Sequence, residues 1–248
     1  MKQIFIFFIF LFFSVPALAE PGKNLIFIFD ASSSMWGKVD NKCKFVIIRE
    51  ILTDIIHTLP DDRNVGLVAY GHRKKADCND VEELIPLGPI DRQKFIEKMK
   101  AIRPVGRTLL VPAIRIATER LKTLGEEGTI ILTSDDKDAC DEDPCATIKR
   151  LREGGAKFTI NMVGFDADES EKEQFKCMAE AGGGEYQTAD EPETFLAAVK
   201  TSAIEKAKPE TEATSSEATE KLKPATEATS SETTDEKAKP ETEATSSE

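Results

Sequence analysis

Apolar and polar positions alternate along the chain in blocks that predict strands and helices in turn. The apolar runs at residues 25–31 and 128–135 are typical of buried strands, and residues 44–59 and 109–122 carry apolar side chains at helical spacing. Further strands are predicted at 64–71, 81–86 (weaker and edge-like), 157–165 and 184–187, and further helices at 92–102, 146–153, 171–181 and from Pro192 to about 206. Strands that alternate with helices in this way predict an α/β fold. Its sheet should be doubly wound and mostly parallel, with helices on both faces.

The first residues of the chain have the pattern of a segment that is removed during export. Lys2 supplies a positive charge, residues 4–13 are an unbroken apolar run, and Ala17-Leu18-Ala19 resembles a cleavage site. We therefore expect a signal peptide at residues 1–19, and an uncleaved anchor is the alternative. The run is shorter than the roughly 20 apolar residues of a membrane span, so no membrane insertion is expected after cleavage. We then expect the rest of the chain to be exported, and its location to be the periplasm, the cell surface or the medium.

The C-terminal residues repeat a polar motif. Residues 206–217 recur as 221–232 and again as 237–248, and no Ile, Leu, Val, Phe, Tyr or Trp follows Leu222. Such a segment cannot bury enough apolar surface to offset the entropy lost on ordering. We expect a disordered, acidic tail rich in Ser, Thr and Pro at residues 207–248, which leaves residues 20–206 as one domain.

Charge excludes one class of partner. The chain carries a net charge of −12 at pH 7, and the acidic excess is divided between the tail and the domain. Binding to nucleic acid requires a basic face that neutralises phosphates. We therefore expect no nucleic acid partner, whereas an acidic domain is compatible with a cation site.

A polar cluster follows the first apolar strand. Asp30, Ser32 and Ser34 form an Asp-x-Ser-x-Ser motif at the point where this strand leaves the sheet, which is where open α/β sheets bind ligands. One carboxylate and two hydroxyls are hard oxygen ligands suited to Mg²⁺. The alternative is a helix N-cap, since Asp and Ser are favoured at that position too.

Two more positions complete a family resemblance. Together with the motif at residues 30–34, the loop residue Thr108 and the strand-end residue Asp135 resemble the metal-ion-dependent adhesion site (MIDAS) of von Willebrand factor type A domains. Four further stretches are similar to the bacterial branch that resembles the calcium-activated chloride channel homologue: residues 70–73, 140–145, 163–166 and 177–183. The resemblance spans the whole domain and implies a Rossmann-like von Willebrand type A fold.

The resemblance also implies roles for the five residues. Ser32 and Ser34 would coordinate the cation directly, Thr108 directly or through water, and Asp30 and Asp135 mainly through water. The cation would be Mg²⁺, with Mn²⁺ or Ca²⁺ as alternatives. An ion with few charged ligands stays electrophilic, so a carboxylate of a protein partner can complete its coordination. The implied function is non-enzymatic, metal-dependent protein binding. Asp136 and Leu109 depart from the family pattern, which usually has Gly and Pro there, but neither departure removes a ligand.

Other interpretations of the polar residues remain open. A metal-assisted hydrolase would need a general base, for which His72 or the acidic loop at residues 136–143 are the candidates. The acidic loop is either a solvated rim or a second cation site, and Trp36 either packs or contacts a partner. In a third interpretation the domain is an inert spacer and the tail is the interacting part.

All five cysteines lie in the exported domain, so disulfides are expected there. Connectivity does not follow from the sequence. We predict Cys78–Cys140 and Cys145–Cys177, because these pairs would fasten loops around the metal face, and we expect Cys43 to be unpaired. A structural zinc site is not expected, since no Cys-x-x-Cys pair exists and only two histidines are available.

Overall fold

A computed structural model describes residues 23–140 and 142–205 of the 248-residue chain. The predicted signal peptide and the predicted tail therefore lie outside the described residues. The described part is built around a six-stranded sheet in the order β5-β4-β1-β6-β7-β8. All neighbours are parallel except β5, which pairs antiparallel with β4 at one edge. The strands are β1 (Asn24–Asp30), β4 (Asn64–Tyr70), β5 (Val81–Pro89), β6 (Gly128–Ser134), β7 (Phe158–Phe165) and β8 (Tyr186–Ala189).

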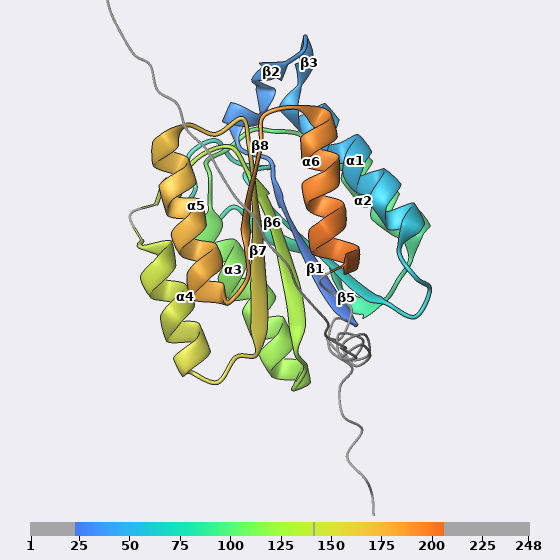
Figure 1. The fold of residues 1–248 in the computed structure, drawn as a ribbon, viewed down its shortest axis with the longest axis vertical. Helices are drawn as coiled ribbons and strands as arrows, with labels where there is room; N and C mark the ends of the chain where they lie inside the picture. The colour runs from blue at the N-terminus through green and yellow to red at the C-terminus, as the bar shows by residue number, and fades with distance from the viewer. Residues whose placement is uncertain (1–22, 141, 206–248) are drawn as a thin grey trace, which may run out of the picture. The chain divides into compact units, whose positions relative to one another are not determined.

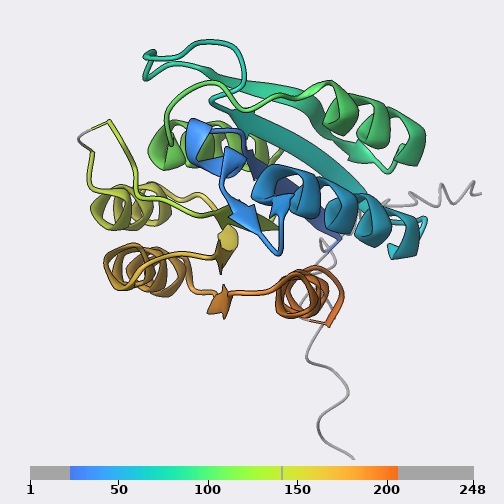
Figure 2. The same cartoon turned by 90° about the horizontal axis from the view of Figure 1, so that it is seen from above.

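Helices cover both faces of this sheet (Figures 1 and 2). One face carries α1 (Lys44–Thr58), α2 (Arg92–Ala101) and α6 (Pro192–Lys200), and the other carries α3 (Leu110–Leu124), α4 (Pro144–Glu153) and α5 (Glu169–Gly182). A short helical turn, η1 (Ser33–Trp36), follows β1, and the two-stranded hairpin β2 (Lys38–Val39) and β3 (Lys42–Cys43) leads into α1. The α/β fold with a mostly parallel sheet is thus confirmed.

The central strand β1 explains why the sheet needs both helical layers. Its seven residues are all buried. Phe27 and Phe29 point into the core beneath α1, α2 and α6, and Ile26 and Ile28 point into the core beneath α3, α4 and α5. Because side chains alternate across a strand, an uninterrupted apolar run can be buried only when both faces are covered. The Phe27 ring packs edge-on against Phe95 of α2, with the centroids 5.7 Å apart.

Local signals fix most of the helix ends. Asp91, Asp143 and Asp168 accept backbone N–H bonds at the starts of α2, α4 and α5, which satisfies donors that a helix N-terminus leaves free. Gly125 and Gly183 end α3 and α5 in the left-handed conformation, which costs glycine nothing.

The predicted strands and helices all form, with ends displaced by up to about three residues, except that the last helix ends about six residues before the predicted end. The predicted helix at 146–153 begins at Pro144, the strand at 184–187 is formed by Tyr186–Ala189, and the last helix ends at Lys200 before a π-helical turn, Thr201–Glu205. The hairpin of β2 and β3 was not predicted. It is short and polar, and its turn residues Asp40 and Asn41 adopt positive φ. Among the described helices, none is both long enough and apolar enough to cross a membrane.

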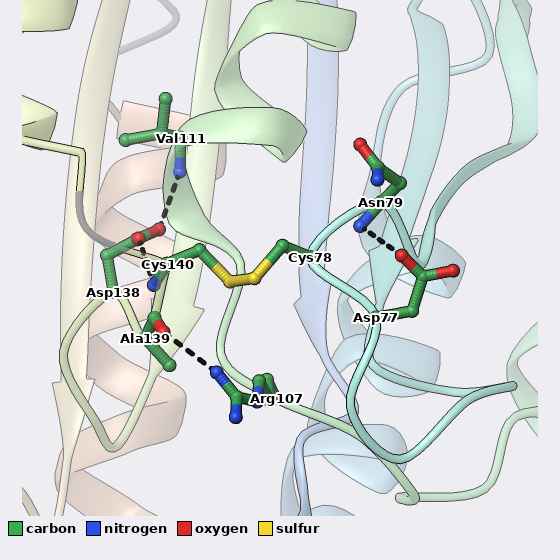
Figure 3. The surroundings of a disulfide bond; sticks show 8 residues. All are labelled: Asp77, Cys78, Asn79, Arg107, Val111, Asp138, Ala139 and Cys140. Carbon is green, nitrogen blue, oxygen red and sulfur yellow. Dashed lines mark hydrogen bonds between the residues drawn. A yellow bond between two sulfur atoms is a disulfide. The ribbon is translucent and has the colours of Figure 1, made fainter.

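Two disulfides join the elements around the carboxyl ends of the strands. Cys78 bonds to Cys140, and Cys145 to Cys177, while Cys43 is free, which confirms the predicted pairing. The Cys78–Cys140 bond links the loop between β4 and β5 to the loop that follows β6 (Figure 3). It therefore ties together segments that are 62 residues apart in sequence.

Candidate metal centre

The predicted ligands meet where the winding of the sheet changes direction. β1 is followed by α1 on one face, and β6, its neighbour in the sheet, is followed by α4 on the opposite face. Such a point, at the carboxyl ends of parallel strands, is the usual ligand position of an open α/β sheet. Asp30 ends β1, and Asp135 comes directly after β6. The topology therefore brings together two carboxylates that lie far apart in the chain.

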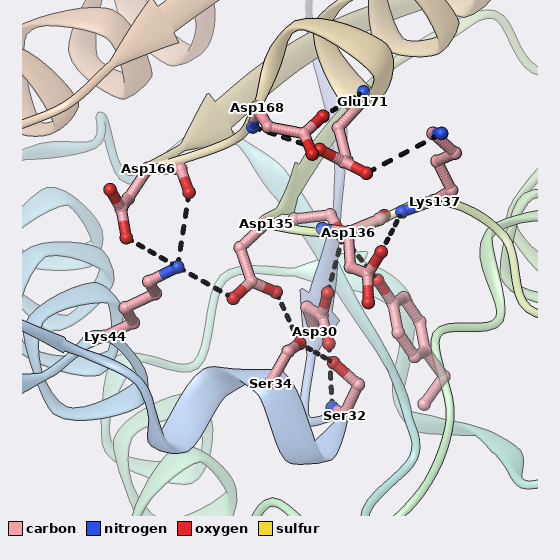
Figure 4. A network of polar contacts seen from close by, with 12 residues as sticks. Asp30, Ser32, Ser34, Lys44, Asp135, Asp136, Lys137, Asp166, Asp168 and Glu171 are labelled. Carbon is pink, nitrogen blue, oxygen red and sulfur yellow. Dashed lines mark hydrogen bonds and ion pairs between the residues drawn. The ribbon is translucent and has the colours of Figure 1, made fainter.

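Three of the predicted side chains form a continuous polar row. The hydroxyl oxygens of Ser32 and Ser34 are 2.9 Å apart, and Ser34 donates a hydrogen bond of 2.6 Å to Oδ1 of Asp135 (Figure 4). Ser32 and Asp135 are buried, and Ser34 is partly exposed. The serines reach this position because the chain turns from β1 into η1, so that residues 32 and 34 face the end of β6. Asp-x-Ser-x-Ser thus acts as an oxygen cluster, and Ser32, the N-cap of η1, makes no side-chain cap bond there.

Asp30 lies at the base of this row and is fully buried. Its Oδ1 accepts the backbone N–H of Ser32 at 2.7 Å, and its Oδ2 accepts the hydroxyl of Ser134 at 2.5 Å. Tyr70 in turn donates to the Ser134 oxygen at 3.2 Å. Burial, and then the negative charge of Asp135, raise the pKa of Asp30 to about 6, although the bonds from Ser134 and Ser32 act in the opposite direction.

Burial also raises the pKa of Tyr70 well above its usual range, with Asp30 as the next cause, so Tyr70 remains a neutral donor. Ser134 and Tyr70 were not predicted as site residues. Their only sequence signal was a polar residue directly before Asp135 and a tyrosine at the end of a neighbouring strand.

Backbone contacts place Thr108 beside the other four. Ser33 N–H donates to the carbonyl of Gly106 at 2.9 Å, and Ala139 N–H donates to the carbonyl of Thr108 at 3.0 Å. The loop at 106–108 is thus held between the β1 loop and the β6 loop. Gly106 also packs against the loop between β4 and β5, where an added Cβ would lie 2.4 Å from the carbonyl oxygen of Lys74. Thr108 is buried, and among the described residues no hydrogen bond joins its hydroxyl to the other four side chains.

Lys44, the first residue of α1, is a member of the cluster that was not predicted. Its ammonium lies 3.1 Å from Oδ2 of Asp135, 2.7 Å from Oδ2 of Asp166 and 3.3 Å from the carbonyl oxygen of Asp166 (Figure 4). Burial lowers the pKa of Lys44, but the hydrogen bonds and charges of Asp166 and Asp135 outweigh it and leave this pKa raised. Lys44 is therefore a fixed positive charge beside a predicted ligand.

The acidic loop after Asp135 is used for local structure. Asp138 accepts the backbone N–H groups of Val111, at the start of α3, and of Cys140, as Figure 3 shows. Asp143 caps α4, and Glu142 pairs with Arg115 at 2.6 Å. In residues 23–140 and 142–205 no group of three or more His, Cys, Asp or Glu side chains is placed to hold a metal ion. The described part of the loop thus gives no support to a second cation site. Asp136 is not among the residues with positive φ, so Asp is tolerated where the family usually has Gly.

His72 and Trp36 lie near this edge but do not join the polar row. Nε2 of His72 is 3.4 Å from Glu82, and its pKa is lowered chiefly by burial. Within the described ranges no hydrogen bond connects His72 to Ser34, as a catalytic arrangement would require. Trp36 packs on one side and is exposed on the other. Its indole N–H donates to the carbonyl oxygen of Pro104 at 3.0 Å, and its ring centroid lies 5.8 Å from that of Phe45. The residue as a whole is 48% exposed.

The chemistry of the donors fits a hard divalent cation. The row and Asp30 at its base offer two hydroxyls and two carboxylates, and Thr108 on the adjoining loop adds a third hydroxyl; all of these are oxygen donors. Asp30 forms no ion pair with any residue that the structure describes, although it is fully buried. A buried carboxylate without a positive partner costs free energy, which a bound cation would recover. The residues present therefore fit a magnesium-type ion better than a site built from histidine or cysteine.

Comparisons with known proteins agree with this architecture. Residues 25–137 match the family model of the von Willebrand factor type A domain. The uncharacterized protein YwmD of Bacillus subtilis (strain 168) is 28% identical over 191 residues, which cover 73% of this chain and 85% of that protein.

Solved structures share the fold. A von Willebrand factor type A protein from Catenulispora acidiphila superimposes with a TM-score of 0.60 and 20% identity, over 73% of this chain and 42% of that one. Proximal thread matrix protein 1 from the mussel byssus, in a structure with a zinc-occupied MIDAS motif, gives a TM-score of 0.54 and 16% identity, over 75% of this chain and 48% of that one. The chain thus spans less than half the length of these two proteins.

Proposed function

We propose that this chain, whose residues 25–137 match the family model of the von Willebrand factor type A domain, is an exported module that binds a protein partner through a divalent cation. Asp30, Ser32, Ser34, Thr108 and Asp135 would hold the ion. The cation would be Mg²⁺, or else Mn²⁺ or Ca²⁺, and would supply a position for an acidic side chain of the partner. Export would follow from the signal peptide at residues 1–19. A place in the bacterial branch similar to the calcium-activated chloride channel homologue is part of the same proposal.

One observation carries the proposal. Asp30 is fully buried with no ion pair in the described part of the chain, and it lies beneath a row of hydroxyl and carboxylate oxygens that reaches the edge of the sheet. Such a charge is costly without a cation. The zinc in the MIDAS motif of the mussel byssus protein, which shares this fold, is further support.

The chain's own residues would divide the work. Ser32 and Ser34 present neutral hydroxyl oxygens, and the carboxylates of Asp30 and Asp135 accept hydrogen bonds. The bonds to Asp30 from Ser32 N–H and from Ser134, which Tyr70 supports, fix its orientation before any ion arrives. Direct coordination by these neutral ligands would leave the ion electrophilic toward a carboxylate of the partner.

The hydrolase alternative has less support. It requires a general base near the ion, but His72 pairs with Glu82. In the loop, Asp138 and Asp143 accept backbone N–H groups at helix starts, and Glu142 pairs with arginine. The proposal is therefore one of binding without turnover.

A cation titration tests the proposal first. Mg²⁺, Mn²⁺ and Ca²⁺ would be titrated into the full protein by calorimetry, with Ser34→Ala as the test variant and Ser33→Ala as the control. Ser33 is the exposed neighbour that lies outside the polar row. We expect saturable binding to the wild type and to Ser33→Ala and none to Ser34→Ala. Equal binding by both variants would contradict the assigned site.

Partner capture is the second test. The wild type and Asp30→Ala would be used to recover partners from an extract of the source organism, with and without a chelator. We expect recovery by the wild type alone, and only when the cation is present. The same recovery in all four conditions would rule out metal-dependent capture.

A further inference from the structure

Lys44 is held in a cage of three oxygens at the edge of the candidate metal centre. An ammonium has three donors, and Oδ2 of Asp135, Oδ2 of Asp166 and the carbonyl oxygen of Asp166 lie at 3.1, 2.7 and 3.3 Å. Its side chain is only 10% exposed. Lys44 is therefore fully partnered and cannot leave without breaking two ion pairs.

The backbone around Lys44 keeps it in this position. Its N–H donates to the carbonyl of Gly37 at 2.8 Å, and its stem passes so close to Gly37 that a Cβ there would lie 3.3 Å from Cε of Lys44. Asp166 adopts a left-handed conformation with φ of 52° directly after β7, and its N–H donates to Ala189 at 2.9 Å. Asp tolerates this conformation better than most residues. In it, the side-chain Oδ2 and the backbone carbonyl oxygen of Asp166 both contact the ammonium of Lys44.

The charge of Lys44 bears directly on the cation. Two of the proposed ligands are carboxylates, Asp30 and Asp135, and Lys44 places a positive charge against Oδ2 of Asp135, which offsets part of this negative charge. We propose that Lys44 sets the affinity of the site by acting as a built-in competitor of the divalent cation. The inference rests on the proposed function, because it concerns the regulation of the same site.

The expected effect is large enough to measure. Coulomb repulsion in water between a divalent cation and a unit positive charge within the same site is enough to weaken an equilibrium constant about tenfold. Lys44→Gln removes this charge and keeps much of the stem, so we expect it to bind Mg²⁺ about tenfold more tightly. Asp166→Asn removes a negative charge at the rim and tolerates positive φ, so we expect it to bind about threefold more weakly.

The experiment is a calorimetric titration of the full protein with Mg²⁺, with urea unfolding to verify that each variant folds. Lys42→Gln is the matched control, since Lys42 is an exposed neighbour that pairs with Glu50 instead. We expect its affinity to equal that of the wild type. The double variant Lys44→Gln/Asp166→Asn has the wild-type net charge, so its affinity should lie between those of the two single variants. A gain in affinity is not what general damage to the structure would produce.

Each outcome decides between the two proposals. If the wild type binds Mg²⁺ and Lys44→Gln binds equally or more weakly, the role of Lys44 is refuted and the proposed function stands. If neither protein binds Mg²⁺, Mn²⁺ or Ca²⁺ although both fold, the proposed function fails and this inference fails with it. If Lys44→Gln does not fold, Asp166→Asn decides: unchanged or tighter binding by that variant would overturn the role of Lys44.

Discussion

Replacing Asp30 by Asn should make the protein more stable in the absence of divalent cations. The carboxylate is fully buried, and burial together with Asp135 raises its pKa from 3.8 to about 6. At pH 7 the folded protein must therefore keep a charge that its surroundings disfavour. This rise in pKa corresponds to about 3 kcal/mol. We expect the neutral amide of Asn to raise the free energy of unfolding by about that amount.

The structure indicates that an amide can replace the carboxylate here. Asn keeps an oxygen for the N–H of Ser32, and its NH₂ group would take the place of Oδ2. The Ser134 hydroxyl now donates to Oδ2, but the carbonyl of Asp136 lies 3.1 Å from the same hydroxyl. Ser134 can therefore turn to donate to Asp136 and accept one N–H of the amide.

The pH dependence gives the sign of the effect. Between pH 3.8 and 6 the folded wild type holds a proton on Asp30 that the unfolded chain has released, so this group destabilises the wild type as pH rises through that window. The gain from Asp30→Asn should be complete above pH 6 and close to zero below pH 3.8. Mg²⁺ at a hundredfold excess over its Kd would stabilise only the wild type, by about 2.7 kcal/mol, and nearly close the gap.

Urea unfolding with a chelator, at pH 7 and at low pH, is the assay for this prediction. Asp54→Asn, on the exposed side of α1, is the control and should change the free energy of unfolding by less than about 0.5 kcal/mol. The reasoning would be refuted if Asp30→Asn were less stable than the wild type at pH 7, or if its gain were the same at both pH values.

Three further predictions address the rest of the molecule. Affinity for Mg²⁺ should fall about tenfold between pH 7 and pH 5, because Asp30 with its pKa of about 6 must lose its proton to support the ion; calorimetry that finds no change would contradict this role. Cys78→Ser/Cys140→Ser should lower the free energy of unfolding by about 4 kcal/mol, as the closed loop spans 62 residues, and urea unfolding that finds less than about 1 kcal/mol would argue against the bond. Removal of residues 207–248 should leave both cation affinity and partner capture unchanged, whereas loss of capture alone would assign partner binding to the tail.

The prediction of the fold from the sequence succeeded where burial leaves a clear pattern. The apolar run of β1 could be accommodated only in a sheet covered on both faces, and the helical spacing in residues 44–59 indicated a helix that covers one of them. It failed for β2 and β3, whose side chains face largely toward solvent and carry no periodic signal. The Asp40-Asn41 pair, which suits a tight hairpin turn, was the one available signal.

The candidate site divides along the same line. Asp30, Ser32 and Ser34 form a motif within five residues, so the sequence alone determined that side-chain oxygen atoms gather where β1 ends. Only the tertiary structure decided that Lys44 lies against Asp135 and Asp166, which are 91 and 122 residues away. The same holds for Ser134, which reaches Asp30 across 104 residues. The apolar periodicity of a segment predicts which of its residues are buried, and it can be found within that segment alone. The pairing of two charged residues depends instead on where distant segments of the chain end in the fold.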